Sequence, residues 1–383
     1  MTVARIADVS ILVHERETLL SIPSRAQVVE QAVLTITTDE GVQGHTFMGL
    51  PQPDVTTQLI KRVKPQLLGR NALDIGAIWG ELGRRRDLDP TVQSYVDVAL
   101  WDIAGKVAGL PVHRLLGTVR NSIPAYASSW VHQDVETYSE EALAYRERGF
   151  AGYKIHPPSM KVGPLGHGAI TADHIETDLR IYRQVRDAVG SAYPLFADPF
   201  AGYTFAQAVR VGLVLEELDY EWFEDPLAAD DIYGYLRLRE KLRIPLLATE
   251  LTKGGPPGHV PWVLERATDY LRGDVVLKGG ITGLVKIAHL AEAFNLNCEL
   301  HDGYNALNNL GVLHVALAIP NCGWYEVLIP HAPGDYSSDH LSWGLVEEIP
   351  IDSNGYASVP DRPGLGIDID WDLVRGRTVA ELR

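Results

Sequence analysis

Cysteine is scarce in this sequence, since 383 residues include only Cys298 and Cys322. Two cysteines cannot supply the disulfide framework of a small secreted domain, and both lie in or beside apolar runs, where we expect buried, reduced thiols. The opening residues from Met1 to Asp8 lack the apolar core of a signal peptide, and no run approaches the roughly 20 apolar residues of a membrane-spanning helix. We therefore predict a cytoplasmic protein.

Basic residues are also few. The chain has 34 lysines and arginines against 50 aspartates and glutamates, which gives a formal net charge of −16. Nucleic acids and anionic membranes bind basic surfaces, so neither is expected as a partner, and an acidic ligand would need local positive charge. With 46% apolar residues, a chain of this length can bury the core of a barrel and one accessory domain.

Strand-like and helix-like patterns alternate one for one from Ile123 onward, which is typical of a parallel sheet with crossover helices. The alternation stops after Pro330, so we predict a barrel over residues 123–330. Its eight candidate strands centre on Tyr126, Lys154, Phe196, Trp222, Leu247, Val276, Glu299 and Tyr325.

The first 122 residues follow a different pattern and predict a separate α+β module. Two strands, 6–13 and 27–37, and a further short strand through Thr46 and Phe47 precede three helical patterns. These patterns cover residues 54–68, 74–86 and 90–108, and the last ends at Gly109. Residues 331–383 contain a hairpin signal at Asn354-Gly355, and we expect this tail to return to the first module.

Three carboxylates, Asp198, Glu224 and Glu250, each close a short apolar run, and one strand plus one helix separates each from the next. Residues at the C-terminal ends of parallel barrel strands converge on one mouth, where barrel enzymes do their chemistry. Three converging carboxylates favour a hard cation such as Mg²⁺ over the alternative of separate salt bridges at the rim. The same spacing of one strand plus one helix places Asp274, His301 and Glu326 in or beside the next three apolar runs.

Lys154 and His156 end the second candidate strand. Residues two apart on a strand share a face, about 6.7 Å from one another. Imidazole has an unperturbed pKa of about 6.5, so His156 can act as a base near neutral pH more readily than a lysine. The alternative is a core histidine whose ring nitrogens bind the backbone.

Three further motifs occur in order along the chain: Ala99-Leu-Trp-Asp-Ile-Ala-Gly-Lys106, Gly279-Gly-Ile-Thr-Gly283 and Pro363-Gly-Leu-Gly366. Together with the carboxylate spacing, the sequence resembles the mandelate racemase subgroup of the enolase superfamily over essentially its whole length. The resemblance implies an α/β fold, a modified TIM barrel of (β/α)7β form with an α+β capping domain built from both termini. It also implies Mg²⁺ held by the three carboxylates and removal of a proton beside a substrate carboxylate.

The resemblance assigns roles to the neighbouring residues. His156 stands where the subgroup often has the second lysine of a Lys-x-Lys motif, with Lys154 as the first. Asp274 and His301 correspond to a dyad in which the aspartate orients the histidine. Glu326 corresponds to an acid that hydrogen-bonds the substrate carboxylate. A small-molecule carboxylate is the expected substrate, and we expect a homo-oligomer.

Polar residues around the expected mouth suit a polyhydroxy substrate. Lys278 is predicted to contact a substrate anion or to form a rim ion pair, and His45, in the capping module, either reaches the substrate or is structural. The remaining candidate substrate contacts are Trp130, Asp302, Tyr304 and Asn305.

Our first functional hypothesis is a Mg²⁺-dependent dehydratase of an aldonate or aldarate. Removal of the proton beside the carboxylate gives an enediolate, and loss of the β-hydroxyl then gives a 2-keto-3-deoxy acid. The second hypothesis is a racemase or epimerase of a 2-hydroxy acid that passes through the same enediolate. A metal-dependent aldolase and a non-catalytic binding barrel remain further alternatives, because a fold alone does not establish catalysis.

Overall fold

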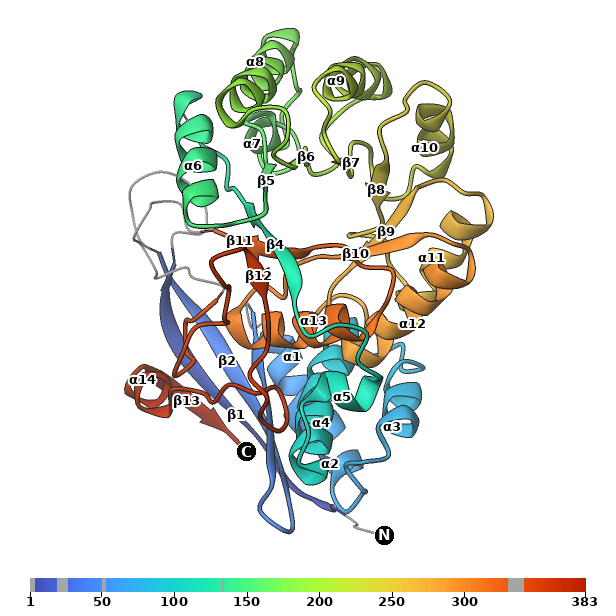
Figure 1. The fold of residues 1–383 in the computed structure, drawn as a ribbon. Coiled ribbons are helices and arrows are strands. Elements are labelled where there is room, and N and C mark those ends of the chain that lie inside the picture. The colour runs from blue at the N-terminus through green and yellow to red at the C-terminus, as the bar shows by residue number, and fades with distance from the viewer. Residues whose placement is uncertain (1–3, 19–26, 50–52, 133, 330–340) are drawn as a thin grey trace.

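The computed structural model describes residues 4–18, 27–49, 53–132, 134–329 and 341–383. Two sheets organise these residues (Figure 1). A four-stranded sheet has the order β13-β1-β2-β3, and a nine-stranded sheet consists of a closed parallel barrel, β4 to β11, with β12 attached to β4. The capping sheet and its helices lie against one end of the barrel, as expected for a barrel with a capping domain.

The capping sheet joins the two ends of the chain. Strands β1 (Ile6–Thr18), β2 (Gln27–Thr38) and β3 (Gln43–Met48) form an antiparallel meander, and β13 (Thr378–Leu382) pairs antiparallel with β1. The predicted return of the C-terminal segment to the first module is therefore confirmed.

Helices cover one face of this sheet. The predicted helix over residues 54–68 is interrupted by a π-helical turn, Leu59–Val63, whereas the longest helix, α4, has the predicted bounds. Pro90 begins α4 behind an Asp89 side chain that accepts a hydrogen bond from Thr91 N, and Gly109 ends it at a φ of 67°. The capping helices are α1 (Pro53–Gln58), α2 (Lys64–Leu67), α3 (Ile75–Leu82), α4 (Pro90–Ala108) and α5 (Val112–Leu116).

Each barrel strand pairs in parallel with the next, and β11 pairs with β4 to close the barrel. The strands are β4 (Ile123–Ser128), β5 (Gly152–Ile155), β6 (Leu195–Ala197), β7 (Trp222–Glu224), β8 (Leu246–Ala248), β9 (Tyr270–Gly273), β10 (Asn297–Leu300) and β11 (Tyr325–Leu328). The helices between them are α6 (Glu136–Glu147), the short α7 (Ser159–Val162), α8 (Ala172–Val189), α9 (Phe205–Glu217), α10 (Ile232–Arg239), α11 (Gly255–Leu264), α12 (Gly280–Ala293) and α13 (Ala306–Ala318). This is the predicted (β/α)7β barrel.

The sixth barrel strand ends earlier than predicted. Strand β9 stops at Gly273, so the prediction that it centres on Val276 was wrong. The cause is Asp274, whose Oδ1 accepts hydrogen bonds from the backbone nitrogens of Val276 (2.6 Å) and Leu277 (2.7 Å) and so begins a turn. Asp274 consequently lies at the C-terminal mouth of the barrel.

The C-terminal tail contacts the barrel before it reaches the capping sheet. Strand β12 (Tyr356–Ala357), which follows the predicted Asn354-Gly355 turn, pairs antiparallel with the start of β4. Helix α14 (Trp371–Gly376) and β13 then complete the capping domain. The predicted domain boundary at residues 330 and 331 lies outside the described residues.

The two glycines before α12 fit a close contact between the barrel and α4. Gly279 and Gly280 have φ angles of 83° and 76°, and a Cβ atom on Gly280 would stand 2.4 Å from Asp97 Oδ2. That oxygen accepts a hydrogen bond from Thr282 N (2.9 Å), and Trp101 Nε1 donates to Thr282 Oγ1 (2.9 Å). Asp97 therefore caps the first turn of α12 from the capping domain.

Asp97→Asn is expected to change how stability depends on pH. Burial raises the pKa of Asp97 to about 7 from 3.8, because the carboxylate loses water that its hydrogen bonds to Thr282 only partly replace. The folded state then holds the proton more tightly than the unfolded state, so this group lowers stability as pH rises from about 4 to 7. Each tenfold difference in proton affinity between the two states corresponds to about 1.4 kcal/mol at most. The variant should lack this decline.

Urea unfolding of both proteins at pH 5, 6, 7 and 8 measures the effect. The free energy of unfolding of the variant should rise relative to that of the wild type as pH increases. A difference between the two proteins that is the same at every pH would come from the amide itself and does not affect this test. Parallel pH profiles would show that Asp97 titrates normally.

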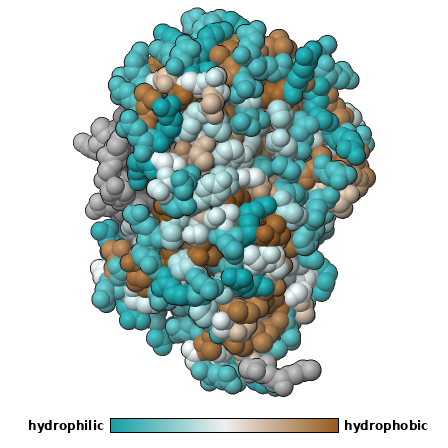
Figure 2. Space-filling view, in the orientation of Figure 1, coloured by the Kyte–Doolittle hydropathy of each residue, from teal (hydrophilic) through white to brown (hydrophobic). Residues whose placement is uncertain are grey.

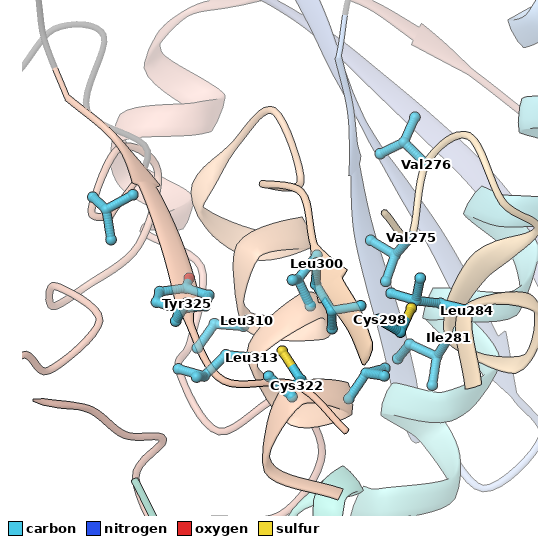
Figure 3. Packing of buried hydrophobic residues seen from close by; sticks show 14 of the residues in the cluster. Val275, Val276, Ile281, Leu284, Cys298, Leu300, Leu310, Leu313, Cys322 and Tyr325 are labelled. Atoms are coloured by element: carbon cyan, nitrogen blue, oxygen red, sulfur yellow. The ribbon is translucent and has the colours of Figure 1, made fainter. Parts of the chain in front are cut away.

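The core is continuous from the barrel wall to its helices, and both cysteines belong to it. Figure 3 shows Cys298 and Cys322 among buried residues of β10, α12 and α13, and both thiols are free, as predicted. The face seen in Figure 2 is largely hydrophilic, with apolar residues in small groups. None of the described helices combines the length and apolar character needed to cross a membrane.

Candidate active site

The three predicted carboxylates converge at the mouth of the barrel. Asp198 follows β6, Glu224 is the last residue of β7, and Glu250 lies two residues beyond β8. All three are buried, and each offers an oxygen within 4.8 Å of an oxygen from the other two. A metal ion bound there would have oxygen ligands from three carboxylates, and oxygen is the ligand atom that Mg²⁺ prefers.

The backbone beside each carboxylate adopts conformations that side-chain-bearing residues rarely take. Positive φ angles occur at Phe200 (52°) and Ala201 (59°) after Asp198, at Asp225 (32°) after Glu224, and at Thr249 (90°) before Glu250. Such strained residues cluster at functional sites, where the surrounding structure holds them in place. Here the residues with positive φ lie within three residues of the carboxylates, so their conformations help to set the directions of the carboxylate side chains.

Lys154 lies among the carboxylates. Its Nζ is 3.2 Å from Asp198 Oδ2, 3.1 Å from Glu224 Oε2 and 2.6 Å from Glu326 Oε1, and its side chain is fully buried. Burial and Arg272 lower its pKa, but the carboxylates of Glu224 and Glu326 outweigh both and raise the pKa well above its usual value. Lys154 is thus a charged partner of the carboxylates in this structure.

Arg272, on β9, is a site residue that the sequence interpretation missed. It is fully buried, with Nε 2.5 Å from Glu224 Oε1 and Nη2 2.5 Å from Glu326 Oε2. Nη1 also donates to the carbonyl oxygen of Leu300 (3.2 Å). The available signal was its position two residues before Asp274, on a strand whose other residues are mainly apolar.

The charges of this group fit a divalent cation. Four buried carboxylates face Lys154, Arg272 and, beside Glu250, His301, so the carboxylates outnumber the cations. Burial raises the pKa of Glu224 to about 7, and Asp198 and Glu326 add to the rise, although Arg272 and Lys154 oppose it. A divalent ion supplies the missing positive charge, so the residues present fit Mg²⁺.

His156 lies on the β6 side of the carboxylates. Its Nδ1 is 2.5 Å from the carbonyl oxygen of Ser129, which can only accept, so Nδ1 carries a hydrogen there. Nε2 is then the nitrogen directed at the site, 3.0 Å from Asp198 Oδ2. Behind it, the hydroxyl of Tyr138 donates to the carbonyl oxygen of His156 (2.8 Å), which fixes the backbone.

His301 lies on the β8 side. Its Nδ1 is 2.8 Å from the carbonyl oxygen of Asp302, and its Nε2 is 3.4 Å from Glu250 Oε1. Burial lowers the pKa of His301, but Glu250, Glu326 and Asp302 outweigh burial and raise it to about 9. The two histidines therefore flank the carboxylates, one at Asp198 and the other at Glu250.

The predicted dyad of Asp274 and His301 is brought together but is not hydrogen-bonded. Asp274 Oδ2 lies 3.9 Å from His301 Nδ1, and it is buried without a hydrogen-bond partner among the described residues. In the present conformation the Asp302 carbonyl, rather than Asp274, orients the ring.

Glu326, which is predicted to hydrogen-bond the substrate carboxylate, contacts both buried cations in this structure. Its Oε1 faces Lys154, and its Oε2 faces Arg272 and accepts from Asp302 N (3.1 Å). Burial raises its pKa, but Arg272, Lys154 and His301 outweigh burial and hold the pKa well below its usual value. Glu326 is therefore an acceptor that joins the two buried cations.

Four predicted substrate contacts lie near the mouth, two of them with structural roles. Asp302 is buried and accepts a hydrogen bond from Tyr304 N (2.9 Å), and Asn305 is the N-cap of α13. The ring of Tyr304 is 5.0 Å from that of His301, and Trp130 follows β4 with its side chain partly exposed. Tyr304 and Trp130 are the two best placed to meet a ligand.

The structure does not bring His45 to the site. Its Nδ1 bonds the hydroxyl of Thr35 (3.1 Å) and its ring contacts Trp371 of α14, whereas the next residue, Thr46, donates to Asn308 of the barrel helix α13. His45 thus faces away from the barrel because alternate residues of a strand point to opposite faces.

The contacts of Lys278 likewise differ from both of its predicted roles. Its Nζ donates to the carbonyl oxygens of Thr249 (2.9 Å) and Thr252 (2.7 Å), so its observed partners are backbone atoms rather than a substrate anion or a rim carboxylate. Burial lowers its pKa, against the effect of Asp274 and Glu250.

Known proteins resemble this chain along its whole length. A profile described as the N-terminal domain of mandelate racemase and muconate lactonizing enzymes matches residues 8–117, and one described as an enolase C-terminal domain-like region matches residues 137–373. Among curated relatives, arabinonate dehydratase from Saccharolobus solfataricus is 29% identical over 374 residues, 93% of each chain. D-galactarolactone cycloisomerase from Agrobacterium fabrum is 29% identical over 353 residues, 89% of each chain.

A solved structure also resembles this chain along its whole length. A crystal structure of D-glucarate dehydratase from Agrobacterium tumefaciens, complexed with magnesium, superposes with a TM-score of 0.87 at 32% identity. The match covers 99% of this chain and 100% of that one.

Proposed function

Since this chain belongs to the mandelate racemase and muconate lactonizing enzyme family of the enolase superfamily, we propose that it is a Mg²⁺-dependent dehydratase of a sugar acid. The proposed substrate is an aldonate or aldarate, and the proposed product is a 2-keto-3-deoxy acid. The chain is an enzyme of that superfamily, and the relatives named above include two sugar-acid dehydratases.

One observation carries the proposal: three buried carboxylates converge between two histidines in a site where carboxylates outnumber cations. Asp198, Glu224 and Glu250 would hold the ion. When bound, Mg²⁺ supplies electrostatic stabilisation to the negative charge that develops on a carboxylate substrate when its α-proton leaves. Arg272 and Lys154 hold Glu224 and Glu326 in place and limit their mutual repulsion.

The two histidines are the proposed groups that move protons. The Ser129 and Asp302 carbonyls each hold one Nδ1–H, so both imidazoles direct Nε2 to the carboxylates. One Nε2 takes the α-proton and the other delivers a proton to the departing β-hydroxyl. Which histidine does which depends on the configuration of the substrate at C2.

The same pair of histidines also suits a racemase or epimerase, in which each side exchanges the α-proton. The first step is shared. In the dehydratase a β-hydroxyl then leaves, whereas in the racemase or epimerase the second histidine returns a proton to the opposite face of the α-carbon. The polar mouth and the names of two of the three relatives reported above support dehydration.

A substrate screen tests the proposal. The wild-type protein with Mg²⁺ should convert at least one member of a library of aldonates and aldarates to a 2-keto acid, detected as its semicarbazone. Glu224→Gln is the matched negative control, since the amide is close in shape to the carboxylate and changes one proposed metal ligand, and circular dichroism checks that the variant is folded. Enantiomer or epimer formation without a keto acid would favour the isomerase alternative, and no reaction across the library would contradict the sugar-acid proposal.

A further inference from the structure

The turn that carries Glu250 is strained and is held by groups outside the carboxylate cluster. Thr249 has a φ of 90°, a conformation that is especially unfavourable for a β-branched residue. Its backbone nitrogen donates to Asp225 Oδ1 (3.3 Å), and its hydroxyl both accepts from Arg272 N and donates to Arg272 O at 3.0 Å. The hydroxyl of Thr249 therefore forms hydrogen bonds to the β9 backbone in place of the backbone hydrogen bonds that would extend the pairing of β8 with β9.

The remaining polar atom of Thr249 is its carbonyl oxygen, which accepts from Lys278 Nζ at 2.9 Å. The same ammonium donates to the carbonyl oxygen of Thr252 at 2.7 Å. Thr252 N also bonds the Thr249 carbonyl (3.3 Å), so Lys278 joins the first and last residues of a four-residue turn that contains Glu250.

The path of the Lys278 side chain is built into the barrel. Lys278 follows β9, and its stem crosses Gly273, where a Cβ atom would stand 2.8 Å from Lys278 Cγ. Lys278 and Thr249 are both buried, with 1% and 0% of their surfaces exposed. A charged side chain buried this deeply needs strong partners, and charge-assisted hydrogen bonds to two carbonyl groups supply them.

We propose that Lys278 is a positioning residue that holds the Thr249–Thr252 turn and thereby directs the Glu250 carboxylate toward the metal site. This inference rests on the proposed function, because it assumes that Glu250 is a metal ligand. Groups that orient metal ligands from behind typically change metal affinity about 10-fold to 100-fold when they are removed. The lysine acts through the backbone of the turn, because its ammonium donates to the carbonyl oxygens at both ends.

Metal affinity measured without substrate tests this role directly. Mn²⁺ binding, followed by electron paramagnetic resonance of the free ion, is compared in the wild type and in Lys278→Met, which keeps an unbranched stem but removes all three donors. The dissociation constant should rise about 10-fold or more. Lys106→Met is the matched control, because Lys106 also donates to a backbone carbonyl, that of Gln43 (2.8 Å), but lies in the capping domain. Its Mn²⁺ affinity should equal that of the wild type.

Coupling to the strained residue separates positioning from a general structural effect. Glycine adopts a φ of 90° without strain, and Thr249→Gly also removes the hydroxyl that bonds Arg272, so the variant changes how the turn is held. Lys278→Met should then weaken Mn²⁺ binding by a different factor in the Thr249→Gly background than in the wild type. Equal effects in both backgrounds would overturn the inference.

The outcomes distinguish the inference from its premise. If the wild type binds no Mn²⁺, the proposed metal site fails. If the wild type binds and folded Lys278→Met binds within about twofold of it, below the range expected for a group that orients a ligand, only the inference fails. Should Lys278→Met not fold, Lys278→Gln, whose side chain is shorter and has two uncharged N–H donors, serves in its place and is expected to weaken binding in the same direction.

Discussion

Glu224→Gln should lower kcat/KM by at least about 1,000-fold, because it removes one of the three negative charges that would hold Mg²⁺. The amide also leaves Arg272 and Lys154 without a buried carboxylate that lies 2.5 Å and 3.1 Å from them. Both effects lower the affinity for a divalent ion, the first by losing a ligand and the second by leaving positive charge nearby. Steady-state kinetics and Mn²⁺ binding measure the two consequences separately.

Glu221→Gln is the matched control for this prediction. Glu221 lies just before β7, three residues from Glu224, and its side chain is exposed at the other end of the strand. Its replacement should leave activity and metal affinity unchanged. In the wild type, chelation should stop turnover until Mg²⁺ is restored, and full activity in protein verified to be metal-free would contradict the metal assignment.

The carboxylate cluster was predictable from sequence because its geometry depends on topology alone. Asp198, Glu224 and Glu250 each follow a parallel strand, and parallel barrel strands end at the same mouth. Spacing along the chain is then enough to infer proximity in space. The predicted fold is confirmed for the same reason, since one-for-one alternation of strands and helices admits few architectures.

Arg272 could not be assigned in this way. A buried cation on a barrel strand is stable only because Glu224 and Glu326 come from strands β7 and β11 and meet it inside the barrel. The sequence does not specify which charges on distant strands meet. The contacts of Glu326 were not predictable for the same reason, because its two oxygens meet Lys154 and Arg272 from other strands.

His45 illustrates a second limit. Along a strand, a shift of one residue exchanges the two faces, and sequence alone did not tell which face of the capping sheet meets the barrel. The structure assigns that face to Thr46, which contacts Asn308, and leaves His45 beside Trp371. The end of β9 was missed for a local reason. The Asp274 side chain accepts hydrogen bonds from two backbone nitrogens, and such bonds begin a turn instead of continuing the strand.

His301→Asn should separate the two proton transfers. In deuterium oxide, with a substrate found by the screen, overall turnover should fall by about 100-fold to 10,000-fold, the usual contribution of one acid or base group. If His156 removes the α-proton, exchange of that proton for deuterium should persist in the variant, because proton removal precedes and does not require departure of the hydroxyl. Proton nuclear magnetic resonance follows exchange and product formation in one sample.

His156→Ala should then abolish exchange as well as turnover, since Nε2 of His156 is the imidazole nitrogen beside Asp198 on that side of the cluster. His289→Asn, at an exposed position of α12, is the control and should behave as the wild type. Loss of exchange in His301→Asn together with its retention in His156→Ala would reverse the two roles. If His156→Ala changes neither exchange nor turnover, the hydrogen bonds of His156 to Ser129 and Asp198 are structural, and proton removal must take place from the His301 side.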